Sequence, residues 1–366
     1  MKKEWVDKAV ENSRYAREKM EEFAKSYKEN PEVIADYLQF SQRFYEYSPR
    51  NLRLIYQQNR GATFVKSFAD WKKEGVSVKR GETGIAIWVP VQVTLLEVGE
   101  GKYIPLREAN AQQKADYKAG KIESVKQLRY KVGHIFDIGQ TTYPKDQYPK
   151  IYNMGSFSEN KEKLIDTLKL FSENELGCTV VQEDLQSIAL RGYYCDKKIA
   201  LNQKLETTET LSTLTHEMGH AMAHNKDKDK GKNTAQKEYE ADCVSIVFQS
   251  YMGEDISDTR KRHLAENYKR YRRELEKKFV GKAGEELEKL IDKEMESNFD
   301  TVHSIIKENL TKLEKYLNNS EFIPKRTLEL LEERSEDKGF YYKKEQKKGL
   351  FEKVQKGHGM ETVSYT

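Results

Sequence analysis

The chain has 366 residues, enough for two or three domains of ordinary size. Charged residues make up 34% of it and the mean hydropathy is −0.88, so much of the chain must form solvated helix surface. The formal net charge is only +4, which excludes a globally basic nucleic-acid binder and confines any nucleic-acid site to a local patch.

Targeting and redox features favour the cytoplasm. Charged residues are spread through the segment from Met1 to Met20, and no apolar run is long enough for a signal peptide or a transmembrane helix. Cys178, Cys195 and Cys243 form no CxxC pair and cannot all be bridged, which favours a reducing compartment and argues against a structural cysteine zinc site. We therefore expect a soluble cytoplasmic protein with no membrane partner. Its oligomeric state is not predicted.

The first 150 residues predict helices, a sheet and a linker, since prolines and glycines interrupt the helical pattern. Helices are expected at residues 1–29, 31–47, 51–58 and 67–74. Two strands are expected around the glycine-bearing turn Arg80–Gly84. A helical piece at Ala109–Ala119 and a strand at Leu128–Ile138 follow, and the linker is expected at Gly139–Lys150.

Cations and aromatic residues alternate through this first segment. The combination suits single-stranded nucleic acid, because cations hold the phosphates and rings stack on unpaired bases. The alternative is structural, since aromatic residues at helical spacing are more often core and runs of Lys and Arg are usually solvated. The residues that we predict to contact nucleic acid are Arg50, Asn51, Arg53, Lys66, Trp71, Lys79 and Arg80.

The stretch LSTLTHEMGHAMAH, residues 211–224, carries an HExxH motif. His216 and His220 lie four residues apart, which places both on one face of a helix. Two imidazoles in that relation can hold one Zn²⁺, and Glu217 beside the first can reach the metal-bound water. Because the motif is short and also occurs by chance, a third ligand is needed.

Acidic residues on the next predicted helix, KEYEADCVSIVFQSYMG, supply that ligand. We favour Glu238, because Asp242 then falls four residues on and can orient a ligating histidine. Glu240 is the competing ligand, and these acids could instead merely favour a helix N-terminus. His224 could also replace the glutamate, but it is better placed to cap the helix that carries the motif.

This set of residues predicts metal-assisted peptide hydrolysis. Zn²⁺ held by three protein ligands keeps a fourth position for water and lowers its pKa to about 7. Glu217 is the expected base, which passes the proton on to the leaving amine. Either KIAL (198–201) or IALRGYY (188–194) is expected to be an edge strand that aligns the substrate backbone. The sequence does not identify the donor that assists at the carbonyl oxygen.

Beyond residue 253 the chain predicts long charged helices at Asp255–Lys278 and Glu285–Tyr316, and a further helix at Arg326–Glu336. An apolar stripe on the second of these suits a helical bundle or an oligomerising hairpin. The lysine-rich tail Lys343–Thr366 is expected to be loose. Three remaining histidines are interpreted as structural or surface residues: His263, His303 and His358.

The motifs of the first segment together resemble the N-terminal domain of ArdC-type antirestriction proteins. They are the helix led by Asn51, the helix with Phe68 and Trp71, the Lys79–Gly84 turn, and HIFDIGQTTYP at residues 134–144. In that family a single-stranded-DNA-binding domain precedes a zincin-like metallopeptidase domain. The second segment also resembles the ImmA/IrrE-like peptidases, whose Glu-x-x-Ala-Asn/Asp pattern matches residues 238–242 and supports Glu238 as the ligand.

The resemblance implies an α+β fold in three regions. A mixed helix and antiparallel-sheet DNA-binding domain is expected at 1–142, the zincin-like domain at 143–256, and a charged helical extension at 257–366. The implied function is protection of the incoming DNA of a mobile element from host restriction, with single-stranded DNA as partner. One alternative is a regulatory zinc protease that cleaves a specific repressor or defence protein. Another is a non-catalytic interaction protein whose C-terminal helices dock a partner.

Overall fold

The computed structural model describes residues 2–99, 101–147, 161–187, 189–224 and 231–319. The predicted helix Arg326–Glu336, the tail and His358 lie outside these residues, as does the end of the predicted linker. Within the described residues, no helix is both long and apolar enough to cross a membrane. The three cysteines are free thiols.

The four N-terminal helices begin within two residues of their predicted starts, and serine caps mark the starts of two of them. The side chain of Ser48 accepts a hydrogen bond from the amide of Asn51, with Pro49 in the first turn, and Ser67 caps the next helix in the same way. The elements are α1 (Lys2–Glu29), α2 (Val33–Ser41), the 3₁₀-helix η1 (Gln42–Phe44), α3 (Pro49–Gln58) and α4 (Phe68–Lys73).

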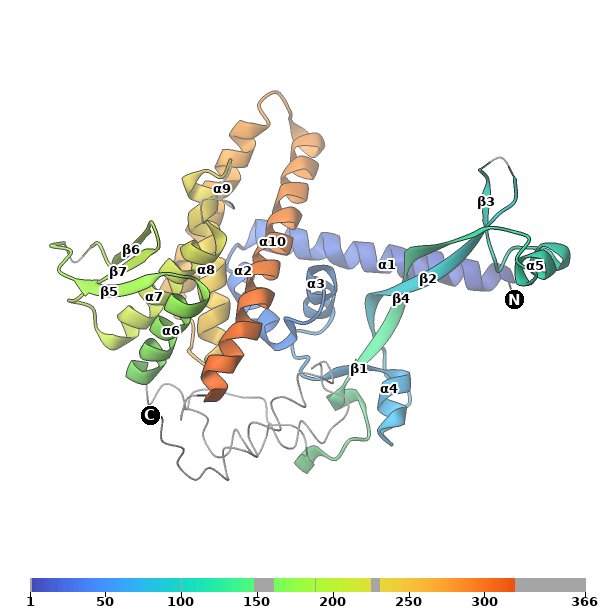
Figure 1. Ribbon diagram of the computed structural model, residues 1–366, viewed down its shortest axis with the longest axis horizontal. Coiled ribbons are helices and arrows are strands. Elements are labelled where there is room, and N and C mark those ends of the chain that lie inside the picture. Colours follow the sequence, from blue (N-terminus) through green and yellow to red (C-terminus); the bar gives the residue numbers. More distant parts are fainter. Residues whose placement is uncertain (1, 100, 148–160, 188, 225–230, 320–366) are drawn as a thin grey trace, which may run out of the picture.

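A four-stranded antiparallel sheet follows, in the order β1-β4-β2-β3. Its strands are β1 (Val65–Ser67), β2 (Ile85–Glu97), β3 (Tyr103–Pro105) and β4 (Ser124–Asp137), with α5 (Ala111–Lys118) between the last two. The 3₁₀-helices η2 (Ile138–Gln140) and η3 (Lys145–Gln147) come next. The paired β2 and β4 form a long ribbon that runs beside α1 away from the helical body (Figure 1).

The predicted hairpin around Arg80–Gly84 is wrong in its first strand. Val78 makes only an isolated bridge to Thr141, whereas β2 pairs along its length with β4. The turn is held from outside the predicted hairpin, because the Gln140 side chain donates to Glu82 and to the carbonyl of Thr83. The glycines of the turn therefore predicted the turn correctly, but they did not predict that β4 is the strand that pairs with β2.

The second half of the chain places a small sheet beside two central helices. It contains α6 (Lys161–Glu175), β5 (Thr179–Glu183), β6 (Gly192–Cys195), β7 (Lys198–Asn202), α7 (Thr207–Ala223) and α8 (Thr234–Tyr251). The sheet order is β5-β7-β6, with β5 parallel and β6 antiparallel to β7. The segment KIAL is therefore the middle strand and not an edge. The sheet has two edges, β5 and β6, and β6 comes from the other predicted segment, IALRGYY.

The last two helices, α9 (Asp258–Lys278) and α10 (Gly284–Asn319), are part of the core. Phe299 of α10 packs among aromatic rings of α1 and α2, with ring centroids 5.9 Å from Phe23, 5.7 Å from Tyr27 and 5.8 Å from Tyr37. The apolar stripe of α10 is covered by this same chain, not left for an oligomerising hairpin.

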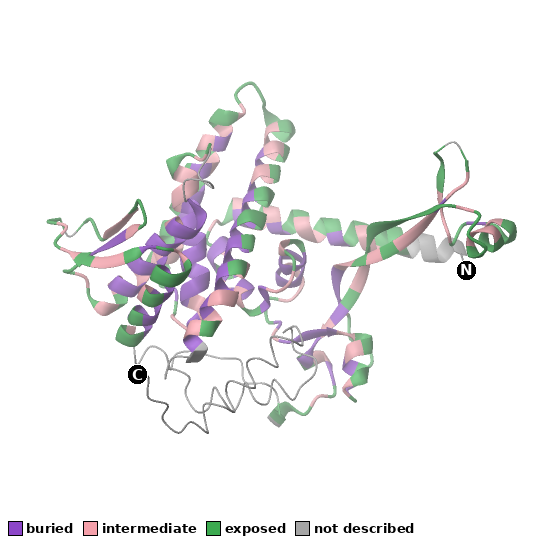
Figure 2. Ribbon diagram, viewed as in Figure 1, coloured by how far each residue is buried: buried purple, intermediate pink, exposed green. Residues whose placement is uncertain are grey.

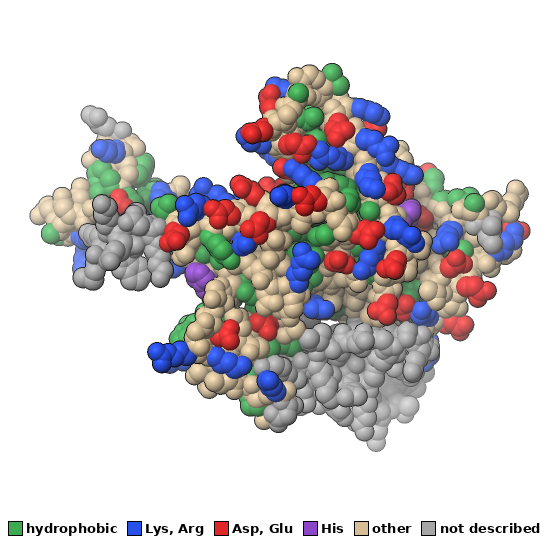
Figure 3. Space-filling model, turned by 180° about the vertical axis from the view of Figure 1, so that it is seen from behind, with side chains coloured by type: hydrophobic (Ala, Val, Ile, Leu, Met, Phe, Trp, Pro, Cys, Tyr) green, Lys and Arg blue, Asp and Glu red, His purple; other side chains and the backbone are tan. Residues whose placement is uncertain are grey.

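One hydrophobic core joins the three regions that the sequence divides after residues 142 and 256. Figure 2 shows buried residues concentrated where the helices of the body meet, while the ribbon is mostly exposed or intermediate. Lys and Arg alternate with Asp and Glu over the helical body on the face shown in Figure 3, in keeping with the small net charge. The regions are therefore packed together rather than strung as independent units.

A buried histidine on α10 predicts acid sensitivity. Burial, assisted by the charge of Lys307, lowers the pKa of His303 from 6.5 to about 4. Below pH 6.5 the unfolded chain binds the proton more readily than the folded one, so stability falls with pH until it reaches about 4. We expect this residue to cost about 2 kcal/mol of stability between pH 7 and pH 5.

The measurement is urea unfolding of the native protein and of His303→Gln at both pH values. The native protein should lose about 2 kcal/mol more than the variant on acidification. Equal losses in the two proteins would show that His303 does not carry this sensitivity.

Candidate metal centre

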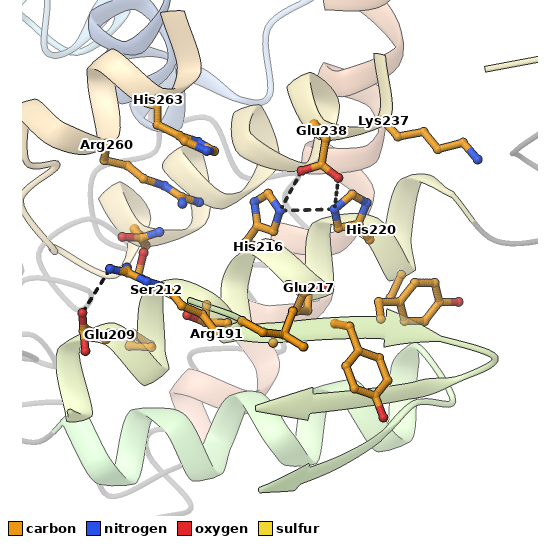
Figure 4. Close-up of a pocket in the computed structure, with 18 of the residues that line it drawn as sticks. Arg191, Glu209, Ser212, His216, Glu217, His220, Lys237, Glu238, Arg260 and His263 are labelled. Carbon is orange, nitrogen blue, oxygen red and sulfur yellow. Dashed lines mark hydrogen bonds and ion pairs between the residues drawn. The ribbon is translucent and has the colours of Figure 1, made fainter. Parts of the chain in front are cut away.

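A cleft of about 1660 Å³ lies between the helical body and the small sheet. It is lined by α7, the start of α8, the first turns of α9 and the edge strand β6 (Figure 4). The three predicted metal ligands His216, His220 and Glu238 lie in it. The large cleft and the predicted site are therefore one feature.

The ligand atoms of the three residues converge. One ligand atom from each of His216, His220 and Glu238 lies within 4.8 Å of the others. The two Nε2 atoms are 3.2 Å apart, and the Glu238 carboxylate oxygens lie 3.4 Å and 3.5 Å from them. A tetrahedral ion with bonds of about 2.05 Å requires ligand atoms about 3.3 Å apart. Two imidazoles and a carboxylate at these distances can therefore hold a divalent cation.

His216 is oriented by a buried carboxylate. Its Nδ1 lies 3.0 Å from Oδ1 of Asp242, so the proton is held at Nδ1 and the Nε2 lone pair faces the other ligands. Burial opposes ionisation of Asp242, but the charge of Arg260 and the hydrogen bond from His216 hold its pKa well below the usual range. Against the effect of burial, hydrogen bonds to Asp242 and Glu238 raise the pKa of His216 to about 9, so metal binding would release the proton at Nε2.

His220 is oriented by a relay through His224. Nε2 of His224 lies 3.0 Å from the Glu240 carboxylate, and its Nδ1 lies 3.0 Å from Nδ1 of His220. The carboxylate accepts a hydrogen bond from Nε2–H of His224, so Nδ1 of His224 accepts from Nδ1–H of His220, whose Nε2 lone pair is left for a ligand role. Burial and the charge of His216 lower the pKa of His220 to about 3.

The two alternative ligands are thus engaged elsewhere. His224 ends α7 as its C-cap, and both of its ring nitrogens have partners. Glu240 is fully buried, where it accepts hydrogen bonds from Lys232, Gln236 and Asn298. Neither belongs to the convergent set, because each supports a histidine from behind.

The side chain of Glu217 projects from α7 toward the small sheet and is only 7% exposed. Burial raises its pKa to about 7, although the charge of His216 and the backbone amide of Tyr194 on β6 oppose the rise. A carboxyl group with a pKa near neutrality can accept a proton and later return it. The arrangement suits a general base that is not itself a ligand.

A glycine sets the distance between α7 and α8. A Cβ added at Gly219 would lie 2.8 Å from the carbonyl oxygen and 3.0 Å from the Cα of Ala241, both backbone atoms of α8. Behind this contact, Thr215 Oγ1 and Ser245 Oγ are 2.9 Å apart, and Gln249 donates to both. This close packing fixes the histidines of α7 relative to Glu238 of α8.

We expect Gly219→Ala to destabilise the protein by about 1–3 kcal/mol, because backbone does not yield as a flexible side chain does. Separation of α7 and α8 would also move Glu238 from the histidines and weaken zinc binding. Thermal unfolding with and without zinc measures both effects. Gly61→Ala is the matched control, since a Cβ there would meet only an ordinary contact at 3.5 Å. Equal behaviour of the two variants would contradict this role of Gly219.

Two residues of α9 that the sequence did not assign to the site also line the cleft. His263 was interpreted as structural or surface, but its Nδ1 lies 2.8 Å from Oδ2 of Asp242. Arg260 donates to Ser245 Oγ at 2.8 Å and lies 3.3 Å from Asp242. Their spacing of three residues on a charged helix is too common to have been a signal in the sequence.

Four of the seven predicted DNA contacts are buried instead. Asn51 exchanges two hydrogen bonds of 2.8 Å with the backbone of Trp88, which ties α3 to β2. Arg53 is 2% exposed and pairs with Asp300 of α10 at 3.1 Å. Lys66 pairs with Glu74, and its ammonium lies over the ring of the fully buried Trp71. The other three predicted contacts are exposed: Arg50, Lys79 and Arg80.

The ribbon carries an exposed surface that the sequence did not predict. Partners in an antiparallel ladder share a face, so Trp88 with Val132, Pro90 with Tyr130, Gln92 with Leu128, and Thr94 with Lys126 lie on one side. Leu128 and Tyr130 are each 60% exposed. The Arg50 guanidinium lies 4.9 Å from the Trp88 ring. We name this surface the Trp88 face: Arg50, Trp88, Pro90, Lys126, Leu128 and Tyr130.

Comparison with known proteins identifies both halves of the chain. Residues 15–132 match the family model of the N-terminal domain of anti-restriction factor ArdC, and residues 173–280 match the IrrE N-terminal-like domain. Together the two matches cover more than half of the chain. The domain order expected from the sequence is confirmed.

The individual relatives have low sequence identity to this chain. The chain is 29% identical over 259 residues to an uncharacterized protein of Bacillus anthracis, a match that covers 66% of this chain and 44% of that protein. The chain thus spans less than half the length of that relative. Crystal structures of the antirestriction protein ArdC of the R388 plasmid are 14% identical, each with a TM-score of 0.40. The metal-free form covers 73% of this chain and 86% of that chain, and the Mn(II)-bound form covers 72% and 84%.

Proposed function

Because this chain has the two-domain order of an ArdC-type antirestriction protein, we propose that it binds single-stranded DNA and protects incoming DNA of a mobile element from host restriction. We further propose that its cleft is a zinc-dependent peptidase site. The observation that carries the proposal is the convergence of His216, His220 and Glu238 in a chain that also carries an ArdC N-terminal domain. Residues 1–142, 143–256 and 257–366 are its proposed DNA-binding, peptidase and helical regions.

The residues of the cleft suit peptide hydrolysis. His216, His220 and Glu238 would hold the zinc ion, which when bound supplies an acidified water and polarises a carbonyl. Asp242 and His224 keep the two imidazoles in the tautomers that ligation needs. Glu217 accepts the proton of the attacking water and delivers it to the leaving amine. The edge strand β6 can pair with an extended substrate backbone.

The Trp88 face is the proposed contact for DNA. Its exposed ring at Tyr130 can stack on an unpaired base, and Arg50 and Lys126 bracket the face with positive charge for phosphates. Among the residues predicted from the sequence, this assignment keeps Arg50, with Lys79 and Arg80 as further exposed candidates. The four buried residues instead hold the domain together.

A fluorescence-anisotropy titration with a labelled single strand, and with a duplex of equal length, tests the DNA-binding half. We expect preference for the single strand and a loss of about 1–3 kcal/mol in affinity for Tyr130→Ala. Lys126→Ala should reduce the salt dependence by about 0.7 of a logarithmic unit per unit of log salt. Lys131→Ala is the control, because Lys131 pairs with Val89 on the opposite face. Equal losses for Lys126→Ala and Lys131→Ala would contradict the assignment to the Trp88 face.

A second candidate function is a regulatory protease that cleaves a specific repressor or defence protein. The IrrE-like match and the cleft beside an edge strand favour it. A restriction assay in cells separates the two functions. It compares the survival of incoming DNA in cells that carry the native protein and in cells that carry Glu217→Gln. Retained protection with zinc still bound favours DNA binding as the mechanism, whereas lost protection favours proteolysis. A native protein that neither binds single strands nor protects DNA would overturn the main proposal.

A further inference from the structure

We propose that His263 of α9 is a further catalytic residue, whose Nε2 contacts the carbonyl oxygen of the peptide bond under attack. The inference rests on the proposed peptidase function and names the donor that the HExxH motif leaves unassigned. It follows from how the imidazole is held, where it lies relative to Glu217, and what the hydrolysis needs.

The imidazole of His263 is anchored at one end and open at the other. Its Nδ1 lies 2.8 Å from Oδ2 of Asp242, which is fully buried. The His263 side chain itself is 53% exposed and lines the cleft. With Nδ1 engaged by the carboxylate, the only other polar atom of the ring is Nε2, on the side away from Asp242.

Asp242 does not need His263 as a structural partner. Its Oδ1 accepts from His216 and lies 3.3 Å from Arg260, while Oδ2 also accepts from Asn267 at 2.7 Å. The carboxylate would keep partners on both oxygens without the half-exposed imidazole. The position of His263 is therefore better explained by a role in the cleft than by a need of Asp242 for another hydrogen-bond donor.

The same carboxylate fixes His263 relative to the metal ligands. Oδ1 of Asp242 holds His216 and Oδ2 holds His263, so one rigid group sets the separation of the two imidazoles. A catalytic donor must be held in this way, because a misplacement of about 1 Å costs much of its effect. Arg260 supports the arrangement from α9 as a positioning residue, since it binds both Asp242 and Ser245.

His263 and Glu217 lie on different sides of the ligand set. Glu217 is on the side of β6, where the backbone amide of Tyr194 reaches it. His263 and Arg260 come from α9, which packs on α8, and Figure 4 shows them on the side of His216 away from His220, whereas Glu217 lies toward the small sheet. A peptide lying between them would have the base on one side and the donor on the other.

Hydrolysis needs a group at each of these positions. When the water oxygen bonds to the carbonyl carbon, Glu217 takes a proton and the π pair of the carbonyl moves onto its oxygen. As the C–N bond breaks, that pair re-forms the carbonyl and the amine leaves with the proton from Glu217. His263, held at Nδ1 by Asp242, contacts that oxygen through Nε2–H while the oxygen carries the negative charge. Loss of one such donor typically lowers kcat about 10²- to 10³-fold.

The test uses the full chain loaded with zinc, with His263→Ala, His263→Gln and the control Arg262→Ala. Arg262 is an exposed neighbour on the same helix, whose side chain turns back to Thr259. Hydrolysis of fluorogenic casein gives kcat and KM, and metal analysis gives the zinc content. Calorimetry with N-phosphoryl-Leu-Phe, a mimic of the tetrahedral intermediate, measures recognition of the charged oxygen without turnover.

We expect both His263 variants to keep one zinc per chain, to lose about 10²- to 10³-fold in kcat with little change in KM, and to bind the phosphoryl dipeptide at least tenfold more weakly. Arg262→Ala should match the native protein in all three measurements. Unchanged kcat in the His263 variants would overturn the inference and leave the peptidase standing. Loss of zinc in both variants would overturn it in favour of a structural role. A zinc-loaded native protein without hydrolysis would overturn the inference together with the peptidase proposal.

Discussion

Glu217→Gln is expected to lower peptide hydrolysis by about 10²- to 10⁴-fold while the protein keeps its zinc. Glutamine has nearly the same shape as glutamate but cannot take up the proton of the attacking water. Glu217 is not among the three converging ligands, so its loss should leave metal binding intact. The group is 7% exposed, and a neutral amide is easier to bury there than a carboxylate. The variant should therefore fold.

The measurement is the initial rate on fluorogenic casein, with zinc determined on the same samples. Glu209→Gln is the matched control, because Glu209 also lines the cleft but pairs with Arg191 at its exposed rim, at 3.3 Å. The control should keep at least half of the native rate. A Glu217→Gln protein as fast as the control would show that another group acts as the base.

The second large effect is expected for Asp242→Ala. The carboxylate is fully buried and contacts His216, Arg260, His263 and Asn267. Its removal leaves an arginine and three polar side chains without their shared acceptor, which typically costs about 3–5 kcal/mol in a buried network. His216 also loses the group that fixes its tautomer, so zinc affinity should fall about 10- to 100-fold.

Urea unfolding of the zinc-free protein measures the first effect, and competition with a chelator measures the second. Asp255→Ala is the control within the same cleft, since Asp255 is exposed. Zinc affinity equal to that of the control would mean that Asp242 does not orient His216. A stability loss below about 1 kcal/mol would mean that the four donors find other partners.

Local sequence rules predicted much of this molecule. The four-residue spacing of His216 and His220 predicted that they share one face of a helix. The same spacing of Glu238 and Asp242 predicted the face of the following helix that meets the two histidines. Prolines and glycines that interrupt the helical pattern gave the approximate bounds of the N-terminal helices. These features depend on contacts within a few residues, which the sequence displays directly.

The features that escaped prediction depend on contacts between distant segments. Arg53 looked like a free cation until α10 brought Asp300 to it, from 247 residues further along the chain. His263 looked isolated because Asp242 lies one helix earlier. Tyr130 became a candidate for stacking only when β4 paired with β2 and turned that side chain outward. Composition marks such residues as polar or aromatic, but only the fold decides which of them are buried.

Helix α10 shows how closely the regions are joined. Its Asn298 donates to Glu240, behind the relay that orients His220. Two residues on, Asp300 pairs with Arg53 of α3, the helix that Asn51 ties to the ribbon. The same helix thus supports both the proposed peptidase site and the proposed DNA-binding domain, which the sequence treated as separate from it.

X-ray absorption spectroscopy of the zinc-loaded protein tests the central claim most directly. The account predicts one zinc per chain, with two imidazole nitrogens and a carboxylate oxygen at about 2.0–2.2 Å, and a signal that is lost in His220→Ala. Coordination by sulfur, or zinc that stays bound in His220→Ala, would place the ion elsewhere and contradict the site.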